Sequence, residues 1–306
     1  MAAPSFAAAS GGNFDPQTGH AVDLLPGLVR VTAPNRGPYT FTGTNSFIVG
    51  HDTVAVIDPG PDDAGHLAAL NAAIGGRRIG QIVLTHTHLD HSALAHRMAR
   101  ETGAPVWAQG PHRLSRPRLT FEVNLLSGGC DWNLMPDRIL ADGEIFTAGD
   151  LDFVAMATPG HCANHMGFGV AGTGWLLTGD HVMGWNSTLV AVPDGSMADY
   201  LASLEKVIGS HWQHYLPAHG GPVTAGPAYA RALLAHRQLR NSQIIDAVRR
   251  GSHSTGALLR AIYKGIAPAL NVAARMTLEA HIEYLAGRGD IVAERGLFGW
   301  RLSSRR

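Results

Sequence analysis

The chain has 306 residues, 45% of them hydrophobic, and its 24 Lys and Arg balance its 24 Asp and Glu. No stretch of 18 or more apolar residues occurs, so no membrane span is expected. Two cysteines, Cys130 and Cys162, give no disulfide framework, and the first residues lack the basic and apolar segments of a secretory signal. We therefore expect a cytoplasmic globular protein.

The neutral total hides two oppositely charged parts. Residues 1–224 carry 11 Lys and Arg against 19 Asp and Glu, a formal charge of −8. Residues 225–306 carry 13 against 5, a formal charge of +8. A basic tail on an acidic body can dock on that body, or it can hold a polyanion such as nucleic acid.

The N-terminal part of the chain predicts a weakly ordered segment and then a β-meander. Residues 1–21 are mostly small and polar, and structure is expected to begin near Val22. Strands are predicted over 28–31, 46–49 and 53–57. The last of them ends at Asp58 in an Asp-Pro-Gly turn. The Asp58 carboxylate either caps local backbone amides or braces a metal-binding histidine.

The most informative stretch is residues 81–91, which follows a helix predicted over 62–75. The apolar run from Ile82 to Leu84 predicts a buried strand. Directly after it, and at the start of a helix predicted over 92–101, come His86, His88, Asp90 and His91. Alternate residues of an extended chain point to the same side, so His86 and His88 share one side, and Asp90 and His91 face the same space from the first turn of the helix. Imidazoles with a carboxylate suit zinc, so the stretch predicts a metal site.

Three later strands each end in a further donor. Strands predicted over 153–156, 175–177 and 215–216 run into His161, Asp180 and His219. Each signal is weak alone, but with residues 86–91 they make seven candidates. Seven donors are too many for one catalytic zinc. We therefore predict two ions about 3.5 to 4 Å apart, which share one carboxylate and hold a hydroxide between them.

Several other positions carry open alternatives. His165, four residues after His161, either protonates a leaving group or is a structural brace. The segment from Asp194 to Asp199 is interpreted as the cap of the next helix and as purely structural. Residues 110–137 are predicted to form an irregular loop over a site.

The basic tail predicts three helices and a hairpin. Helices are expected over 226–250, 258–264 and 271–286, and a hairpin over 291–302. Together they indicate a winged-helix domain over residues 223–306. Its surplus of arginine would suit phosphate contacts. The alternative is a packing or dimerisation module that covers the site of the acidic body.

The ordered series His86-x-His88-x-Asp90-His91, His161, Asp180 and His219, preceded by Asp58, resembles the metallo-β-lactamase fold superfamily over residues 22–222. The resemblance implies an α/β (α+β) fold, a four-layer αββα sandwich with the small C-terminal winged-helix domain. It also implies that His86, His88 and His161 hold a first Zn²⁺. Asp90, His91 and His219 would hold a second Zn²⁺, with Asp180 as the bridge. Manganese or iron could replace zinc.

The segments Gly43-Thr-Asn-Ser46 and Gly179-Asp-His-Val-Met-Gly184 resemble the β-lactamase-like protein 2 group, and so does the tail. Some members of that group are endoribonucleases that cleave single strands. One departure is Cys162, where Thr commonly follows the histidine. Its thiol could perturb the first metal, or it could act as a small apolar filler.

These observations lead to a binuclear zinc hydrolase in which Asp90 orients the nucleophile and takes its proton. The leading hypothesis for the substrate is the phosphodiester of single-stranded RNA. The main alternative is a small-molecule ester, a thioester as in glyoxalase II, or a lactone. β-Lactam hydrolysis is a third hypothesis. A protein of another class, a metal-sensing winged-helix regulator, is also considered, and a homodimer is possible.

Overall fold

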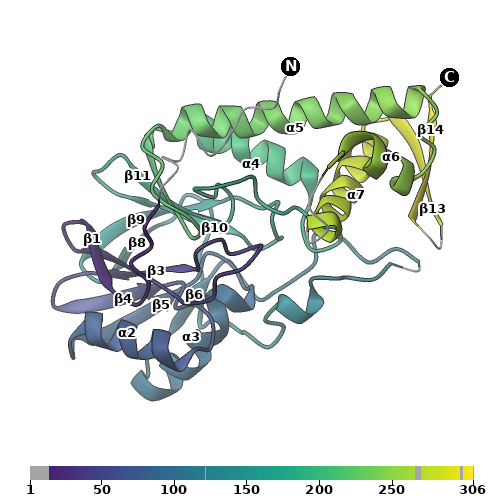
Figure 1. Cartoon of the computed structure of the whole chain (residues 1–306). Coiled ribbons are helices and arrows are strands. Elements are labelled where there is room, and N and C mark those ends of the chain that lie inside the picture. Colours follow the sequence, from purple (N-terminus) through teal and green to yellow (C-terminus); the bar gives the residue numbers. More distant parts are fainter. Residues whose placement is uncertain (1–13, 121, 266–269, 297–298, 306) are drawn as a thin grey trace.

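Two β-sheets packed face to face form the body of the protein, and helices cover both outer faces in this computed structural model (Figure 1). The structure describes residues 14–120, 122–265, 270–296 and 299–305. Residues 1–13 of the N-terminal segment predicted to be weakly ordered lie outside this part. Within it, no helix is both long and apolar enough to cross a membrane.

The first sheet is antiparallel in its first half and parallel in its second. In spatial order it holds β1 (Ala21–Leu25), β2 (Leu28–Thr32), β3 (Asn45–Val49), β4 (Thr53–Ile57), β5 (Arg78–Val83), β6 (Val106–Ala108) and β7 (Arg138–Ile139). The predicted meander is confirmed as β2, β3 and β4. Because β4 and β5 are parallel, both carry their C-terminal residues to the same edge of the sheet.

The second sheet contains two strands that the sequence did not indicate, β8 and β10. Its spatial order is β12 (His214–Pro217), β11 (Trp175–Gly179), β10 (Met166–Val170), β9 (Leu151–Ala157) and β8 (Ile145–Ala148). β10 reads Met-Gly-Phe-Gly-Val, and its two glycines lower the strand signal. Gly169 is required there because a Cβ atom would clash with the ring of Trp212.

Three apolar layers hold the sandwich together. Phe47 and Ile57 of the first sheet meet Phe153 and Phe168 of the second between the sheets. Leu70 and Leu94 anchor α2 (Ala64–Ile74) and α3 (Leu89–Thr102) on the first sheet. Tyr200, Leu204 and Leu233 anchor α4 (Met197–Gly209) and α5 (Gly226–Arg249) on the second. The predicted four-layer αββα arrangement is confirmed.

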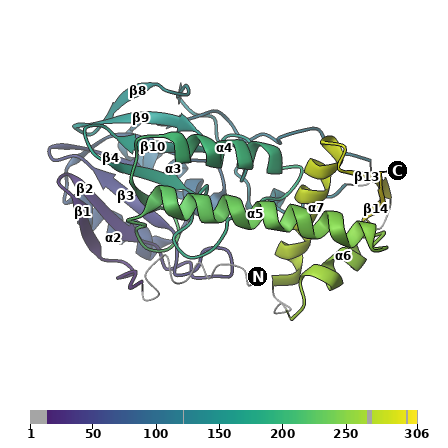
Figure 2. The ribbon, with the colours of Figure 1, turned by 90° about the horizontal axis from the view of Figure 1, so that it is seen from above.

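The tail shares one long helix with the body (Figure 2). The first half of α5 packs on α4 through Leu233, and its second half packs through Ile244 and Val248 on the rest of the tail. That remainder comprises α6 (Thr255–Ile262), α7 (Asn271–Gly287), β13 (Ile291–Gly296) and β14 (Gly299–Ser304). Three helices and an antiparallel pair of strands are therefore present, whereas the tip of the predicted hairpin, residues 297–298, lies outside the described residues. The domain boundary at residue 222 remains a prediction.

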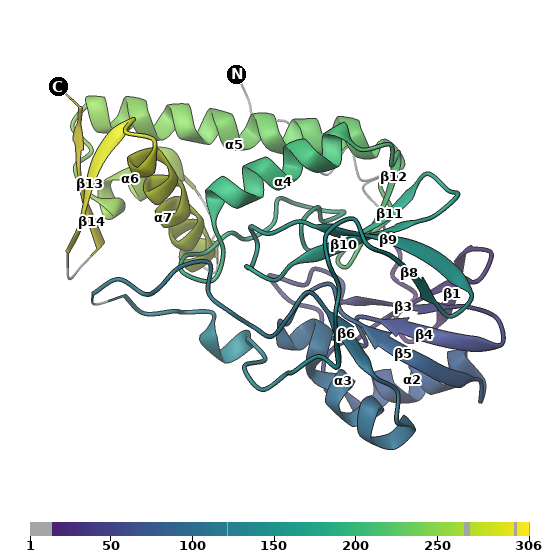
Figure 3. The same cartoon turned by 180° about the vertical axis from the view of Figure 1, so that it is seen from behind.

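An ionic contact ties the long loop of residues 110–137 to the tail. Arg116 of this loop pairs both with Glu122 and with Glu283 of α7. Figure 3 shows the loop extending from the body toward the tail. Glu122 is buried, and although burial raises its pKa, the hydrogen bonds from Arg116 bring that pKa below its usual range. The ion pairs of Arg116 thus hold this loop against α7 of the tail.

Candidate metal centre

The seven predicted donors meet at one edge of the sandwich, where several strands end. His86 and His88 follow β5, and Asp90 and His91 lie in the first turn of α3. This helix begins at Leu89, three residues before the predicted start. The remaining donors come from the segments after β9, β11 and β12, so residues far apart in the sequence share one site.

The first group of donors consists of three histidines. The Nδ1 atom of His88 lies 3.1 Å from Nε2 of His86 and 2.9 Å from Nε2 of His161. All three side chains are buried. Three ring nitrogens that converge in this way match the ligand set of a zinc site.

A second group lies beside the first, with Asp180 between them. The Oδ2 atom of Asp90 lies 3.4 Å from Nε2 of His91 and 3.3 Å from Nε2 of His219. Asp180 directs Oδ2 to His161, at 3.5 Å, and Oδ1 to His219, at 3.3 Å. Its two oxygens therefore face different groups, as a bridging carboxylate requires.

Every histidine of the two groups has its second ring nitrogen next to an oxygen. These pairs are His86 with Thr85 Oγ1 (3.0 Å), His88 with Asp194 Oδ2 (2.8 Å), His91 with Asp58 Oδ2 (3.1 Å), His161 with the Leu189 carbonyl (2.7 Å) and His219 with the Gly43 carbonyl (3.2 Å). Such acceptors place the proton on the outer nitrogen and leave the inner lone pair free for a cation. The ring orientations are thus fixed from outside the site.

Two buried atoms at the centre lack a hydrogen-bond partner among the described residues. They are Nε2 of His91 and Oδ1 of Asp180. Buried polar atoms are nearly always paired, and leaving them unpaired costs free energy. A cation between the groups would supply the missing partner. The residues present therefore fit divalent metal ions, and the mixture of imidazole and carboxylate suits zinc, iron or manganese.

The electrostatics of the cluster keep Asp180 ionised and divide the five histidines into two sets. Burial raises the pKa of Asp180, but His219 and His91 bring it well below its usual range. Burial lowers the pKa of His86 well below its usual value, and it lowers that of His161 to about 4, with His88 adding to the effect. Near neutral pH the carboxylate is ionised and these two imidazoles are neutral. Against the effect of burial, Asp194 raises the pKa of His88 to about 10, Asp90 and Asp180 raise that of His91 well above its usual value, and Asp180 and Asp90 raise that of His219 to about 9. Without metal these three rings hold a proton, which a bound metal ion displaces.

Asp58 combines the two roles that the sequence left open. Its carboxylate accepts hydrogen bonds from the backbone N–H and the hydroxyl of Thr85, each at 2.7 Å. It also accepts from Nδ1 of His91. Asp58 thus holds the end of β5 and one donor histidine at the same time.

Asp194 is a functional candidate that sequence reasoning missed. Ser196 does cap α4, as expected, by accepting a hydrogen bond from the N–H of Asp199. Asp194, however, is fully buried and pairs with Nε2 of His88 at 2.8 Å and Nε2 of His112 at 3.0 Å. The available signal was its position at the end of the apolar run 189–193, where a carboxylate needs a buried partner.

His165 and Cys162 lie outside the cavity above the donors. The Nε2 atom of His165 accepts the backbone N–H of Asp180 at 3.0 Å, and Nδ1 pairs with the hydroxyl of Thr158. Both ring nitrogens are engaged and the ring is fully buried, which favours a brace for Asp180 over the proposed proton donor. Cys162 is also buried, and burial raises its pKa, which favours the apolar filler.

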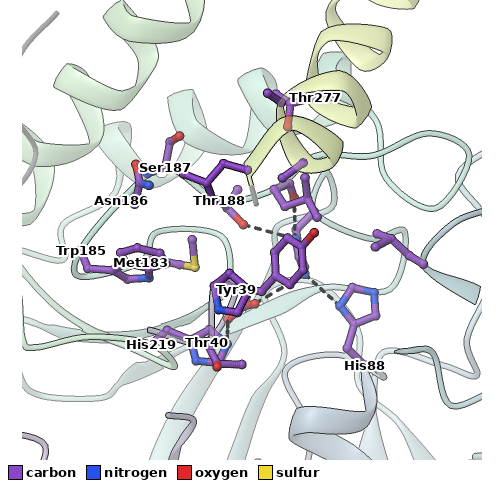
Figure 4. A pocket seen from close by; sticks show the side chains of 18 of the residues that line it. Tyr39, Thr40, His88, Met183, Trp185, Asn186, Ser187, Thr188, His219 and Thr277 are labelled. Atoms are coloured by element: carbon purple, nitrogen blue, oxygen red, sulfur yellow. Dashed lines mark hydrogen bonds and ion pairs between the residues drawn. The ribbon is translucent and has the colours of Figure 1, made fainter. Parts of the chain in front are cut away.

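A cavity of about 450 Å³ opens above the donors (Figure 4). His88, Asp90, His161, Asp180 and His219 line it on the body side. Tyr39, Met183 and Trp185 form part of its wall, and Leu126 and Gly129 come from the loop predicted to cover a site. The opposite side is formed by the tail, through α5 and through Ala274 and Thr277 of α7. The tail therefore roofs the site.

Residues 39–211 match the family described as the metallo-beta-lactamase superfamily, and the chain belongs to this superfamily of hydrolases. It is 28% identical over 233 residues to the lactamase-like protein vrtG of Penicillium aethiopicum, and this match covers 74% of this chain and 67% of that protein. It is 27% identical over 274 residues to an atrochrysone carboxyl ACP thioesterase of Emericella nidulans, and this match covers 88% of this chain and 80% of that protein.

Solved structures with the same fold include the tail in the match. A beta-lactamase domain protein from Burkholderia ambifaria superposes with a TM-score of 0.79 at 19% identity and covers 96% of both chains. A metallo-beta-lactamase family protein from Thermus thermophilus gives 0.75 at 23% identity, with 92% of this chain and 100% of that chain covered. The two named relatives are a lactamase-like protein and a thioesterase, so the expected membership of the endoribonuclease group and the winged-helix assignment gain no support.

Proposed function

We propose that the protein hydrolyses a thioester of a small-molecule acid at a centre of two divalent metal ions, with zinc as the ion that suits the donors best. The observation that carries this proposal is the roofed cavity directly above the donor cluster. Its volume of about 450 Å³ lies within the usual range for small-molecule sites. The relative named as an acyl carrier thioesterase adds support, because that name describes cleavage of an acyl thioester.

The leading hypothesis from the sequence, cleavage of RNA, is replaced by its alternative. A nucleic-acid strand needs a long positively charged groove, whereas α5 and α7 here bound a cavity on the side opposite the donors. The charge of the tail does not by itself indicate RNA, because a basic module can also dock on the acidic body of the same chain.

In this proposal His86, His88 and His161 hold one ion, Asp90, His91 and His219 hold the other, and Asp180 contacts both. When bound, the ions supply Lewis-acid chemistry, which polarises a carbonyl and lowers the pKa of water. The outer hydrogen bonds of the histidines keep the donors in place during turnover.

Asp90 is the carboxylate of the centre that reaches the cavity best. Its side chain is 30% exposed, against 8% for Asp180. We assign to Asp90 the orientation of the attacking water and the acceptance of its proton. The water oxygen then bonds to the carbonyl carbon, the C–S bond breaks, and the proton held by Asp90 passes to the leaving thiolate, so that a carboxylic acid and a thiol are released. Tyr39, Met183 and Trp185 would contact the acyl group and exclude bulk water.

A salt titration on two substrate classes tests the proposed function. Metal-loaded protein is expected to hydrolyse the N-acetylcysteamine thioester of benzoic acid, at a rate that changes little between about 50 and 200 mM salt, because this substrate is uncharged. A short single-stranded RNA is expected to remain intact. Cleavage of the RNA that weakens steeply with salt, without thioester turnover, would contradict the proposal. Absence of turnover on both substrates and on esters and lactones would favour the regulator hypothesis.

A further inference from the structure

The roof of the cavity carries two arginines without an acidic partner among the described residues. Arg237 and Arg240 lie three residues apart on α5, so they share one face of the helix, and both line the cavity. Other arginines of the tail, such as Arg275 and Arg295, form ion pairs with Glu279. Arg237 and Arg240 are distinguished from these by two features together, the lack of an acidic partner among the described residues and a place in the lining of the cavity.

Within the described lining of the cavity, the carboxylates are Asp90 and Asp180. Both belong to the metal donors on the opposite side, where they already face histidines. No carboxylate of this described lining lies near the roof to neutralise the arginines. Burial of unpaired charge is costly, so this part of the cavity has a deficit of negative charge that a ligand can fill.

The two arginines have different surroundings. Arg237 is buried, donates from Nη2 to the Thr188 carbonyl, and lies over the ring of Tyr200. Its Nε atom has no hydrogen-bond partner among the described residues. The neighbouring Leu189 carbonyl accepts from His161, so Arg237 also fixes the loop that braces a donor.

Arg240 is partly exposed and better placed to meet a ligand. Its guanidinium lies 4.2 Å from the ring centroid of Tyr263 and donates from Nη1 to Gln243 at 2.9 Å. A guanidinium has five N–H groups, so donors remain for a planar anion. Stacking on Tyr263 holds the group in a fixed orientation.

We propose that Arg240, with Arg237 behind it, binds an anionic group of the substrate at the roof of the cavity, so that the preferred thioesters carry a negative charge. This inference rests on the proposed function and specifies the substrate class. The anion is a carboxylate on the acyl group or a phosphate on the thiol carrier. The two share the same recognition by guanidinium, and the experiment below distinguishes them.

The test compares matched thioesters with wild type and the Arg240→Met variant. For the acyl side, the substrates are the para-carboxybenzoyl and para-carbamoylbenzoyl thioesters of N-acetylcysteamine. For the thiol side, they are benzoyl-coenzyme A and benzoyl-N-acetylcysteamine. The variant is expected to lower the ratio of kcat/KM for charged over neutral substrate by about 10- to 100-fold, mainly through KM, in one of the two pairs. The pair that responds identifies the source of the anion.

Two further variants control for charge and folding. Arg240→Lys keeps the charge and is expected to recover part of the preference. Arg249→Met removes one charge from an exposed position of the same helix and is expected to leave both ratios unchanged. Unchanged ratios in Arg240→Met would overturn the inference.

The inference can fail separately from the proposed function. If wild type hydrolyses none of the thioesters, the proposed function is wrong. Calorimetric titration of wild type and Arg240→Met with terephthalate then tests the anion site alone, because the two proteins have the same metal centre. Weaker binding by Arg240→Met would support the site, whereas equal affinity in wild type and variant would overturn it.

Discussion

The Asp180→Asn variant is expected to lose about a thousandfold or more in kcat/KM and at least one equivalent of bound metal. The two oxygens of Asp180 face different donor groups, at 3.5 Å from His161 and 3.3 Å from His219. The asparagine side chain has a single oxygen and no charge, and its NH2 group would face one of the two donor groups. Loss of several kcal/mol of charge stabilisation corresponds to a factor of this size.

This result is measured as thioester turnover together with metal content per chain. Asp23→Asn is the matched control, because Asp23 is an exposed aspartate of β1. The control is expected to keep wild-type activity and metal content. Retention of two ions by Asp180→Asn, at wild-type affinity, would contradict the bridging role.

The Asp194→Asn variant is expected to lower metal affinity or activity by about 10- to 100-fold, as is usual for partners that orient metal-binding histidines. Asp194 is fully buried, and its two oxygens pair with His88 and His112. The amide cannot accept from both rings, so His88 loses its fixed orientation. Chelator competition measures the change in affinity.

Asp199→Asn is the control for this second variant. Asp199 lies in the same segment but is exposed, so its replacement is expected to change affinity little. A thermal melt of both variants separates loss of folding from loss of orientation. Wild-type metal affinity and activity in Asp194→Asn would show that His88 is oriented by other contacts.

The fold and the donors could be predicted from sequence because their signals are local. His86, His88, Asp90 and His91 follow an apolar strand at fixed spacing, and the structure brings all four to one edge. Strand β10 was not predicted because Gly167 and Gly169 interrupt the usual strand pattern. Gly169 is required by contact with Trp212, which lies 43 residues later in the sequence (212 − 169).

The parts that sequence reasoning missed depend on tertiary contacts. Asp194 was interpreted only through its neighbours in the cap, whereas its partners His88 and His112 come from distant segments. The net charge of the tail does not show which of its arginines have acidic partners, such as Arg288 with Asp290 and Arg295 with Glu279. Nor does charge show that Arg237 and Arg240 face inward, over the donors.

The most direct test is anomalous diffraction from crystals of the zinc-loaded protein, recorded on both sides of the zinc absorption edge. Two peaks are expected, one among His86, His88 and His161 and the other among Asp90, His91 and His219, with Asp180 in contact with both. A single peak, or peaks away from these side chains, would contradict a two-metal centre at this edge of the sandwich.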